Sequence, residues 1–225
     1  MNETSLVTQD GWIMRVQPGT NPDARHLLVL LHGWTGNEEV MWIFTRHLAQ
    51  DNWIISPRGP IHASEGGFGW FPEGNLRTPS LAEIKPVVEA VLSRIDRWAQ
   101  SIQLVDLQLS LMGFSQGAML AYAIALLFPH RVRGIAALAG YLPEKWIDSS
   151  NRGLLSAKPI YIAHGTQDRT VPVSLARQTV QSLEEIGAQV TYCESEAGHK
   201  LTTGCLHGLE NFFQNLPSPD QGNKA

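Results

Sequence analysis

One pentapeptide constrains the fold of this chain more than any other stretch: Gly113-Phe114-Ser115-Gln116-Gly117. Residues 107–112 before it alternate apolar and polar side chains and end apolar, which is typical of a strand. Residues 118–128 after it are almost entirely apolar and predict a helix that is buried on all sides. A Gly-x-Ser-x-Gly pentapeptide between a strand and a helix is typical of a sharp turn that exposes the serine hydroxyl at its tip.

The rest of the chain predicts strands that alternate with helices. We expect strands at residues 11–17, 26–31, 53–56, 132–138, 159–163 and 189–193, and further helices at about 37–50, 81–101, 173–186 and 201–215. Ser80 and Glu83 form a capping-box pattern that opens the helix at 81–101. The alternation predicts a single α/β domain over residues 1–225, a mostly parallel, doubly wound sheet with helices on both faces. The tail at about 217–225 is expected to be disordered.

The composition narrows the range of partners and locations. The chain has 17 basic and 21 acidic residues and a net charge of −4, with no basic stripe, so nucleic acid is not expected as a partner. The longest apolar stretch, residues 118–128, is shorter than the roughly 18 residues that a membrane span needs. The polar start predicts no signal peptide. We therefore expect a soluble, cytoplasmic protein without a membrane span.

The two cysteines, Cys193 and Cys205, form neither a disulfide framework nor a Cys-x-x-Cys motif. Such a pair in a chain without a secretion signal predicts two buried free thiols in a reducing compartment rather than a disulfide.

A serine at the tip of such a turn becomes a nucleophile only when a base takes its proton. The base is typically a histidine held by a carboxylate, and in α/β-hydrolases the chain order is nucleophile, acid, base. Asp168 follows the strand at 159–163, and His199 follows the last strand. Taken alone, Asp168 has an ordinary explanation as a turn or cap residue, and His199 as a polar flanking residue. Their order and their places at strand ends predict Ser115 as nucleophile, His199 as base and Asp168 as the residue that orients the base.

Other residues fit these roles less well. Asp148 and Glu144 follow the preceding strand and are the alternative acids. His32 and His164 precede glycines at strand ends and are expected to orient loops by hydrogen bonding. A metal site built from His32, His164 and His199 lacks the usual ligand spacing, so we predict no metal.

Acyl transfer also needs two N–H donors for the oxyanion. The residue after the nucleophile supplies one, the backbone N–H of Gln116. The loop after the strand at 26–31 supplies the other, and we assign it to the backbone N–H of Trp34. Because both donors are main-chain groups, replacement of Gln116 by alanine should do little.

Taken together, these motifs resemble the phospholipase/carboxylesterase family of α/β-hydrolases, which includes the acyl-protein thioesterases. The matching stretches cover about residues 26–215: Leu31-His32-Gly33, Pro57-Arg58-Gly59-Pro60, the pentapeptide with Ala118, Gly140-Tyr141-Leu142-Pro143, His164-Gly165-x-x-Asp168 with Val171-Pro172, and Gly198-His199. The resemblance implies a Ser115–Asp168–His199 triad that acts on carboxylic esters or thioesters without a cofactor. By analogy it also suggests a homodimer.

The chain departs from the family pattern beside the oxyanion loop. The family often has a small aliphatic residue and a Gly-Asp pair there, whereas this chain has Trp34-Thr35-Gly36-Asn37. We expect the Trp34 indole to narrow the acyl channel and to disfavour long chains. Phe68, Trp70 and Phe71, together with Leu142, are predicted to line the pocket mouth. The alternative, that the aromatic side chains pin the loop at 57–80 to the core, stays open.

These observations predict a serine carboxylesterase that hydrolyses short- to medium-chain esters through an acyl-enzyme. An acyl thioesterase, a lysophospholipase, or an amide or peptide hydrolase on the same triad is the first alternative, because loops rather than the triad choose the substrate. A non-catalytic, ligand-binding scaffold is the alternative of another class. A complete triad argues against it, because a binding protein has no need of an activated serine.

Overall fold

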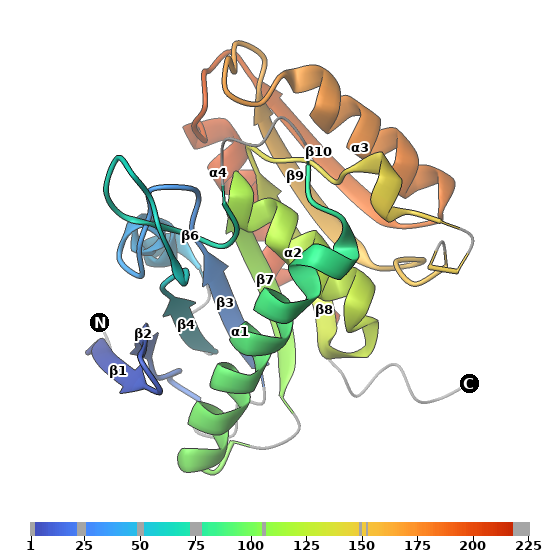
Figure 1. Ribbon diagram of the computed structural model, residues 1–225. Coiled ribbons are helices and arrows are strands. Elements are labelled where there is room, and N and C mark those ends of the chain that lie inside the picture. The colour runs from blue at the N-terminus through green and yellow to red at the C-terminus, as the bar shows by residue number, and fades with distance from the viewer. Residues whose placement is uncertain are drawn as a thin grey trace, which may run out of the picture.

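The structure, a computed structural model, describes residues 3–21, 26–48, 52–72, 78–104, 107–148, 150–151 and 153–217. Eight strands form one sheet in the order β1-β2-β4-β3-β7-β8-β9-β10 (Figure 1). The six strands from β4 to β10 in this order run parallel, whereas β2 is antiparallel to both of its neighbours. The strands are β1 Ser5–Gln9, β2 Trp12–Gln17, β3 His26–Leu31, β4 Trp53–Pro57, β7 Gln108–Phe114, β8 Val132–Leu138, β9 Pro159–Gly165 and β10 Gln189–Ser195.

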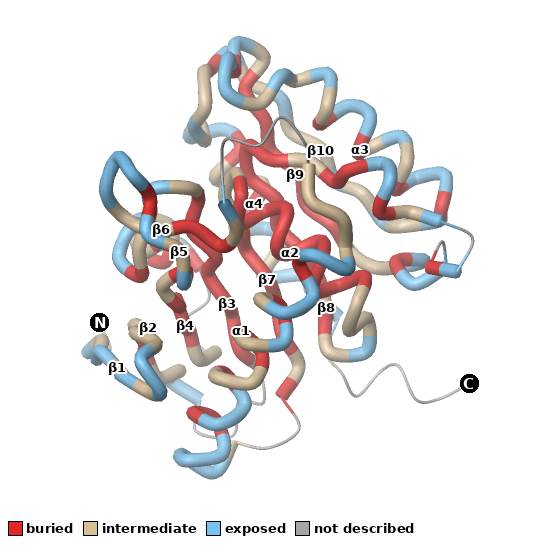
Figure 2. Tube along the Cα trace, viewed as in Figure 1, coloured by how far each residue is buried: buried red, intermediate tan, exposed pale blue. Residues whose placement is uncertain are grey.

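The two faces of the sheet carry separate apolar cores. In β3, Leu27, Val29 and Leu31 pack on the side of α1, α2 and α3, whereas Leu28 and Leu30 pack on the side of η1 and α4. Strands buried on both faces are continuously apolar, and Figure 2 shows the central strands buried along most of their length. The predicted α/β-hydrolase fold is thereby confirmed. The helices are α1 Leu81–Ser101, α2 Gln116–Leu127, α3 Val173–Glu185 and α4 Thr203–Gln214, with 3-10 helices η1 Val40–His47, η2 Pro129–Arg131 and η3 Glu144–Trp146.

The N-terminal edge of the sheet is a hairpin that the sequence analysis missed in part. Strand β1 pairs with β2 around Asp10 and Gly11, whose φ angles are 50° and 77°. Two successive residues with positive φ form the tight turn that matches strand twist, and Asp-Gly is a favoured pair for it. The predicted strand at 11–17 is present as β2, and β1, which was not predicted, forms the edge of the sheet.

Two further segments differ from the prediction. The capping box of Ser80 and Glu83 is present at the start of α1, as predicted. The predicted helix at 37–50 is instead the 3-10 helix η1, whose aromatic and β-branched residues are weak α-helix formers. The predicted long loop contains a small hairpin of β5 (Ile61–His62) and β6 (Phe68–Gly69). Residues 218–225, in which most of the predicted disordered tail falls, lie outside the described residues.

The prediction of two free thiols is wrong, because Cys193 and Cys205 form a disulfide between β10 and α4. Neither cysteine has a neighbouring cysteine in sequence, so only the packing of α4 against β10 brings them together. The cytoplasmic location depended partly on free thiols and stays a prediction.

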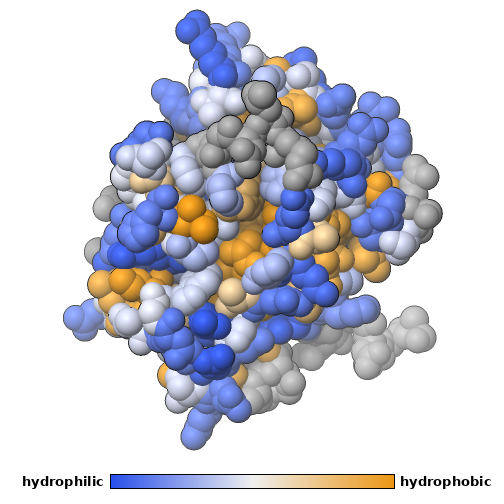
Figure 3. Space-filling view, in the orientation of Figure 1, coloured by the Kyte–Doolittle hydropathy of each residue, from blue (hydrophilic) through white to orange (hydrophobic). Residues whose placement is uncertain are grey.

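The described surface shows no sign of a spanning segment. Among the described residues, no helix is both long and apolar enough to cross a membrane. The face shown in Figure 3 is mostly hydrophilic, and its hydrophobic residues form small groups.

Candidate active site

Ser115 lies between β7 and α2 in a strained conformation, with φ 53° and ψ −115°. A non-glycine residue in this region costs about 1–3 kcal/mol, and such residues cluster at functional sites. The flanking glycines are required by close packing. A Cβ on Gly113 would lie 2.2 Å from the carbonyl oxygen of Gly117, and one on Gly117 would lie 2.1 Å from that of Leu31. The strand and the helix can therefore approach closely enough to hold the serine at the tip.

The loop after β3 packs directly against Ser115. A Cβ on Gly33 would lie 3.3 Å from Ser115 Cβ. The N–H of Gly36 donates to the carbonyl oxygen of Gly33 at 3.0 Å, and Thr35 has a φ of 62°. The hydrogen bond that closes this turn uses the N–H of Gly36 and not the N–H of Trp34. On the other side of the serine, the N–H of Gln116 is the first of α2 and has no acceptor within the helix.

His32 orients this loop by hydrogen bonding, as predicted from the sequence. Its Nδ1 contacts the carbonyl oxygen of Gly33 at 2.7 Å, and its Nε2 accepts the N–H of Gly59 at 2.9 Å. The indole N–H of Trp70 donates to the His32 carbonyl at 2.7 Å. Burial lowers the pKa of His32 to about 4, so the ring is neutral near pH 7.

A partly buried ion pair fixes the far end of the same loop. The guanidinium of Arg58 binds both carboxylate oxygens of Glu38, and it also lies over the ring of Phe68 at 4.6 Å. The indole N–H of Trp42 donates to the Glu38 carbonyl at 2.7 Å. Burial alone would raise the pKa of Glu38, but the hydrogen bonds from Arg58 hold it below its ordinary value. The Pro57-Arg58-Gly59-Pro60 motif thus positions the loop that carries Trp34.

Asp168 and His199 meet at the ends of β9 and β10. His199 Nδ1 lies 2.6 Å from Asp168 Oδ2, and the other carboxylate oxygen accepts the N–H groups of Thr170 and Val171 at 2.8 and 2.9 Å. Burial alone would raise the pKa of Asp168, but the hydrogen bond from His199 and the two N–H groups hold it below 3.8. An ionised carboxylate only accepts hydrogen bonds, so Nδ1 of His199 is the donor in this pair, and Nε2 is the nitrogen without a proton in the neutral ring.

His164 lies behind this pair, with a fully buried side chain. Its Nε2 is 2.8 Å from the carbonyl oxygen of Val171 and 3.4 Å from Asp168 Oδ2. The expectation that His164 orients a loop therefore matches its contacts. The alternative acids lie elsewhere, since Asp148 accepts hydrogen bonds from Ser150 and Glu144 begins η3.

Ser115 and His199 line one cavity of about 650 Å³. The ring of Phe114 packs against the His199 imidazole with centroids 4.9 Å apart. Trp34 also lines the cavity, as its predicted effect on the acyl channel requires. Most of the wall is apolar and comes from η1 and its neighbours: Val40, Met41, Ile43, Phe44, Phe114 and Leu201. The sequence analysis missed these wall residues. Their signal was the apolar run 40–44, which was interpreted only as a helix.

The four residues predicted at the pocket mouth are not among those that line this cavity. Trp70 is buried in the main core through its bond to His32, and Phe71 packs on the same core. Phe68 lies under Arg58, and the N–H of Leu142 donates to Thr179 Oγ1 at 2.9 Å. For the three aromatic residues, these contacts support the alternative explanation, in which their side chains pin the loop at 57–80 to the core.

The side chain of Gln116 also has a role that the sequence did not reveal. Its Oε1 accepts the N–H of Trp70 at 2.7 Å, and its Nε2 donates to the carbonyl oxygen of Phe71 at 2.8 Å. The expectation that an alanine here does little is therefore revised. The Gln116 side chain therefore links the loop after β6 to the turn that carries Ser115.

The model of the phospholipase/carboxylesterase family matches residues 13–216. The chain belongs to this family. It is 25% identical over 227 residues to acyl-protein thioesterase 1 of Saccharomyces cerevisiae, covering 89% of this chain and 96% of that protein. It is 26% identical to carboxylesterase SOBER1 of Arabidopsis thaliana, covering 85% and 90%. The predicted family is confirmed, and with it a hydrolase of the carboxylesterase and thioesterase class.

A solved structure supports the fold independently. The Bacillus cereus carboxylesterase matches 90% of this chain and 93% of its own with a TM-score of 0.79, at 20% sequence identity. Within the described part of the chain, no three His, Cys, Asp or Glu side chains are placed to hold a metal ion.

Proposed function

We propose that this member of the family is a serine carboxylesterase that hydrolyses short- to medium-chain carboxylic esters. One observation carries the proposal: His199, hydrogen-bonded to Asp168, lines the same apolar cavity as the strained Ser115. His199 Nε2 takes the Ser115 proton as the hydroxyl attacks the acyl carbon, and Asp168 stabilises the imidazolium. The N–H groups of Trp34 and Gln116 bind the oxyanion.

The acyl-enzyme is then hydrolysed by the same groups. His199 gives its proton to the leaving alcohol, and a water molecule takes the place of that alcohol. His199 next removes a proton from this water as its oxygen attacks the acyl carbon. The bond between the acyl carbon and Ser115 Oγ then breaks, His199 returns the proton to Oγ, and the carboxylic acid leaves. No step needs a cofactor.

The cavity supports the choice of acyl chain. Its volume lies within the usual range for small-molecule sites, and its walls suit a hydrocarbon chain better than a polar group. Trp34 is one of the residues that line this cavity. We therefore expect turnover to peak at short to medium acyl lengths, and Trp34→Ala to move the peak to longer chains while the backbone donor is kept.

A thioesterase activity on the same residues is the second candidate, favoured by the relatives that are named acyl-protein thioesterases. A panel of p-nitrophenyl esters and matched acyl thioesters of rising chain length tests both candidates. The proposal predicts higher kcat/KM for the oxygen esters, and no turnover of either in Ser115→Ala. A higher kcat/KM for every thioester would favour the second candidate. Unchanged turnover in Ser115→Ala would overturn both.

A further inference from the structure

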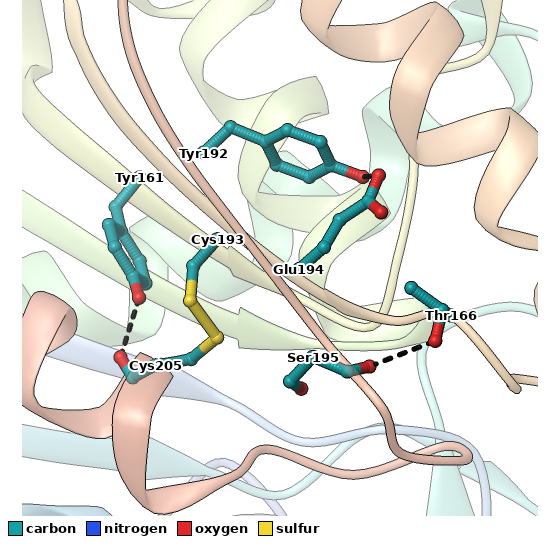
Figure 4. Close-up of a disulfide and its surroundings, with 7 residues drawn as sticks. All are labelled: Tyr161, Thr166, Tyr192, Cys193, Glu194, Ser195 and Cys205. Atoms are coloured by element: carbon teal, nitrogen blue, oxygen red, sulfur yellow. Dashed lines mark hydrogen bonds between the residues drawn. A yellow bond between two sulfur atoms is a disulfide. The ribbon is translucent and has the colours of Figure 1, made fainter.

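One covalent bond joins the two elements that flank His199. Cys193 lies on β10 and Cys205 lies in the first turn of α4, with their Cα atoms 5.7 Å apart (Figure 4). The two cysteines are 12 positions apart, and His199 lies midway between them. The disulfide therefore closes a loop that has the proposed base at its centre.

The first half of this loop is fixed by backbone contacts with the loop of Asp168. The carbonyl oxygen of Ser195 accepts the N–H of Thr166 at 2.8 Å, and that of Ala197 accepts the N–H of Gln167 at 2.9 Å. The hydroxyl of Thr166 reaches the same Ser195 oxygen at 3.3 Å (Figure 4). The chain before His199 is thus held to the residues beside its hydrogen-bond partner.

The second half depends on where α4 begins. Thr202, the N-cap residue of α4, makes no side-chain capping bond. The first turn is instead held by the disulfide and by the Tyr161 hydroxyl, which donates to the Cys205 carbonyl at 2.5 Å (Figure 4). Leu201, just before α4, packs in the core of this face and lines the cavity. The position of the first turn of α4 therefore sets the course of the chain after His199.

We propose that the Cys193–Cys205 disulfide positions His199 for proton transfer, and that its reduction by a dithiol lowers the turnover of the enzyme. This inference rests on the proposed role of His199 as base. It adds a redox control to the reaction, and it makes the two cysteines positioning residues rather than catalytic ones.

The reduction is a thiol–disulfide exchange. A thiolate of the reductant attacks Cys193 Sγ, the more accessible sulfur because Cys205 is 1% exposed. The S–S bond breaks, a mixed disulfide forms on Cys193, and Cys205 leaves as a thiolate that takes a proton. The second thiol of the reductant then closes a cyclic disulfide and releases Cys193. The protein gains two electrons and two protons, and the dithiol is oxidised.

Reduction should change kcat more than KM. Most of the acyl wall comes from η1 and from the turn at residues 33–36, and only Lys200 and Leu201 of the wall directly precede α4, so we expect substrate binding to change little. A displaced base slows the chemical step, and misplacement by about 1 Å can cost up to a hundredfold. We expect kcat to fall about tenfold, KM to stay within about twofold, and activity to return on reoxidation.

The test uses dithiothreitol, because the chain has only two cysteines for it to act on. Ester turnover, free thiols per chain and far-UV circular dichroism are measured on the oxidised, reduced and reoxidised protein. Cys193→Ala/Cys205→Ala is the matched control. It should have the low kcat of the reduced enzyme and should not respond to dithiothreitol.

Two results of the turnover measurements overturn the inference. One is a reduced protein with two free thiols and an unchanged kcat. The other is a loss of kcat together with the far-UV circular dichroism signal, which would mean that the disulfide stabilises the whole fold rather than positioning His199. If the oxidised protein hydrolyses no ester, the proposed function fails separately. The downfield proton resonance of His199 Nδ1 then decides: the inference predicts that it shifts or broadens on reduction, and an unchanged resonance overturns it.

Discussion

The two sides of the site are held in place by different kinds of interaction. On the β3 side, hydrogen bonds from side chains hold the loops next to Ser115. His32 accepts the N–H of Gly59, Arg58 binds Glu38, and Gln116 accepts the N–H of Trp70. On the β9–β10 side, backbone hydrogen bonds and the disulfide fix the loops of Asp168 and His199. The β3 side should therefore respond to acid and to loss of single side chains, whereas the β10 side should respond to reductant.

The largest expected effect is on the β9–β10 side. Asp168→Asn cannot hold the Nδ1 proton of His199, and the wrong tautomer leaves Nε2 unable to accept the Ser115 proton. By analogy with other triads, kcat should fall about ten-thousandfold with little change in KM. Steady-state kinetics with p-nitrophenyl butyrate measure this. Asp148→Asn is the matched control and should keep full activity. More than a tenth of the wild-type kcat in Asp168→Asn would refute the assigned role.

The β3 side should show its dependence on acid in the stability of the fold. The pKa of His32 is about 4 in the folded protein, below the ordinary histidine value of 6.5, so the unfolded state takes up a proton first as the pH falls. The contribution of His32 to the free energy of unfolding is therefore fully present above pH 6.5 and is lost as the pH falls from 6.5 to 4. The free energy of unfolding should fall by about 3 kcal/mol over this range through His32 alone.

Urea unfolding at several pH values tests this for the wild type and for His32→Gln, whose amide oxygen can accept the Gly59 N–H but does not titrate. Between pH 6.5 and 4, the free energy of unfolding of the variant should fall by about 3 kcal/mol less than that of the wild type. His130→Gln, at an exposed histidine, should leave the dependence as it is. An equal pH dependence of the free energy of unfolding in the wild type and in His32→Gln would contradict the expected acid sensitivity of the β3 side.

A smaller effect is expected from Gln116→Ala. The substitution leaves the buried N–H of Trp70 without its acceptor, which costs about 1–3 kcal/mol of stability. Because the backbone N–H of residue 116 remains, kcat should fall far less than in Asp168→Asn. Thermal melts and kinetics measure the two effects. Gln181→Ala, at an exposed glutamine of α3, should change the stability by no more than about 0.5 kcal/mol.

The smallest effect concerns the cavity wall. Ile43 is 69% exposed on η1 and lines the cavity, so Ile43→Ala should hardly change stability. It should lower kcat/KM for hexanoate and octanoate esters by roughly three- to fivefold, at about 0.8 kcal/mol for each lost methylene contact, and leave acetate esters unchanged. Leu6→Ala, at a leucine that is 57% exposed on β1, is the control. An equal loss for all chain lengths would place the acyl chain elsewhere.

Much of the fold could be predicted because its signals are local. The pentapeptide around Ser115, the capping box of Ser80 and Glu83, and the apolar strand at 26–31 each specify their own conformation from neighbouring residues. The order of Ser115, Asp168 and His199 was equally readable, because the carboxyl ends of parallel strands meet at one edge of a sheet.

The features that were missed depend on partners far away in the chain. The disulfide joins residues on two elements, and the side chain of Gln116 binds backbone groups about 45 positions earlier. Phe68, Trp70 and Phe71 have the same aromatic character whether they line a pocket or anchor a loop. Only the hydrogen bond from Trp70 to His32 and the position of Arg58 over Phe68 separate these roles.

The central claim is that Ser115 is acylated with His199 as its base. The most direct measurement is a rapid-mixing experiment with p-nitrophenyl butyrate, followed by acid quench and mass spectrometry of the peptides. The account predicts a burst of about one equivalent of p-nitrophenol and a butyryl group on Ser115. Both should be lost in His199→Gln. A butyryl group on another residue, or an undiminished burst in His199→Gln, would contradict the account.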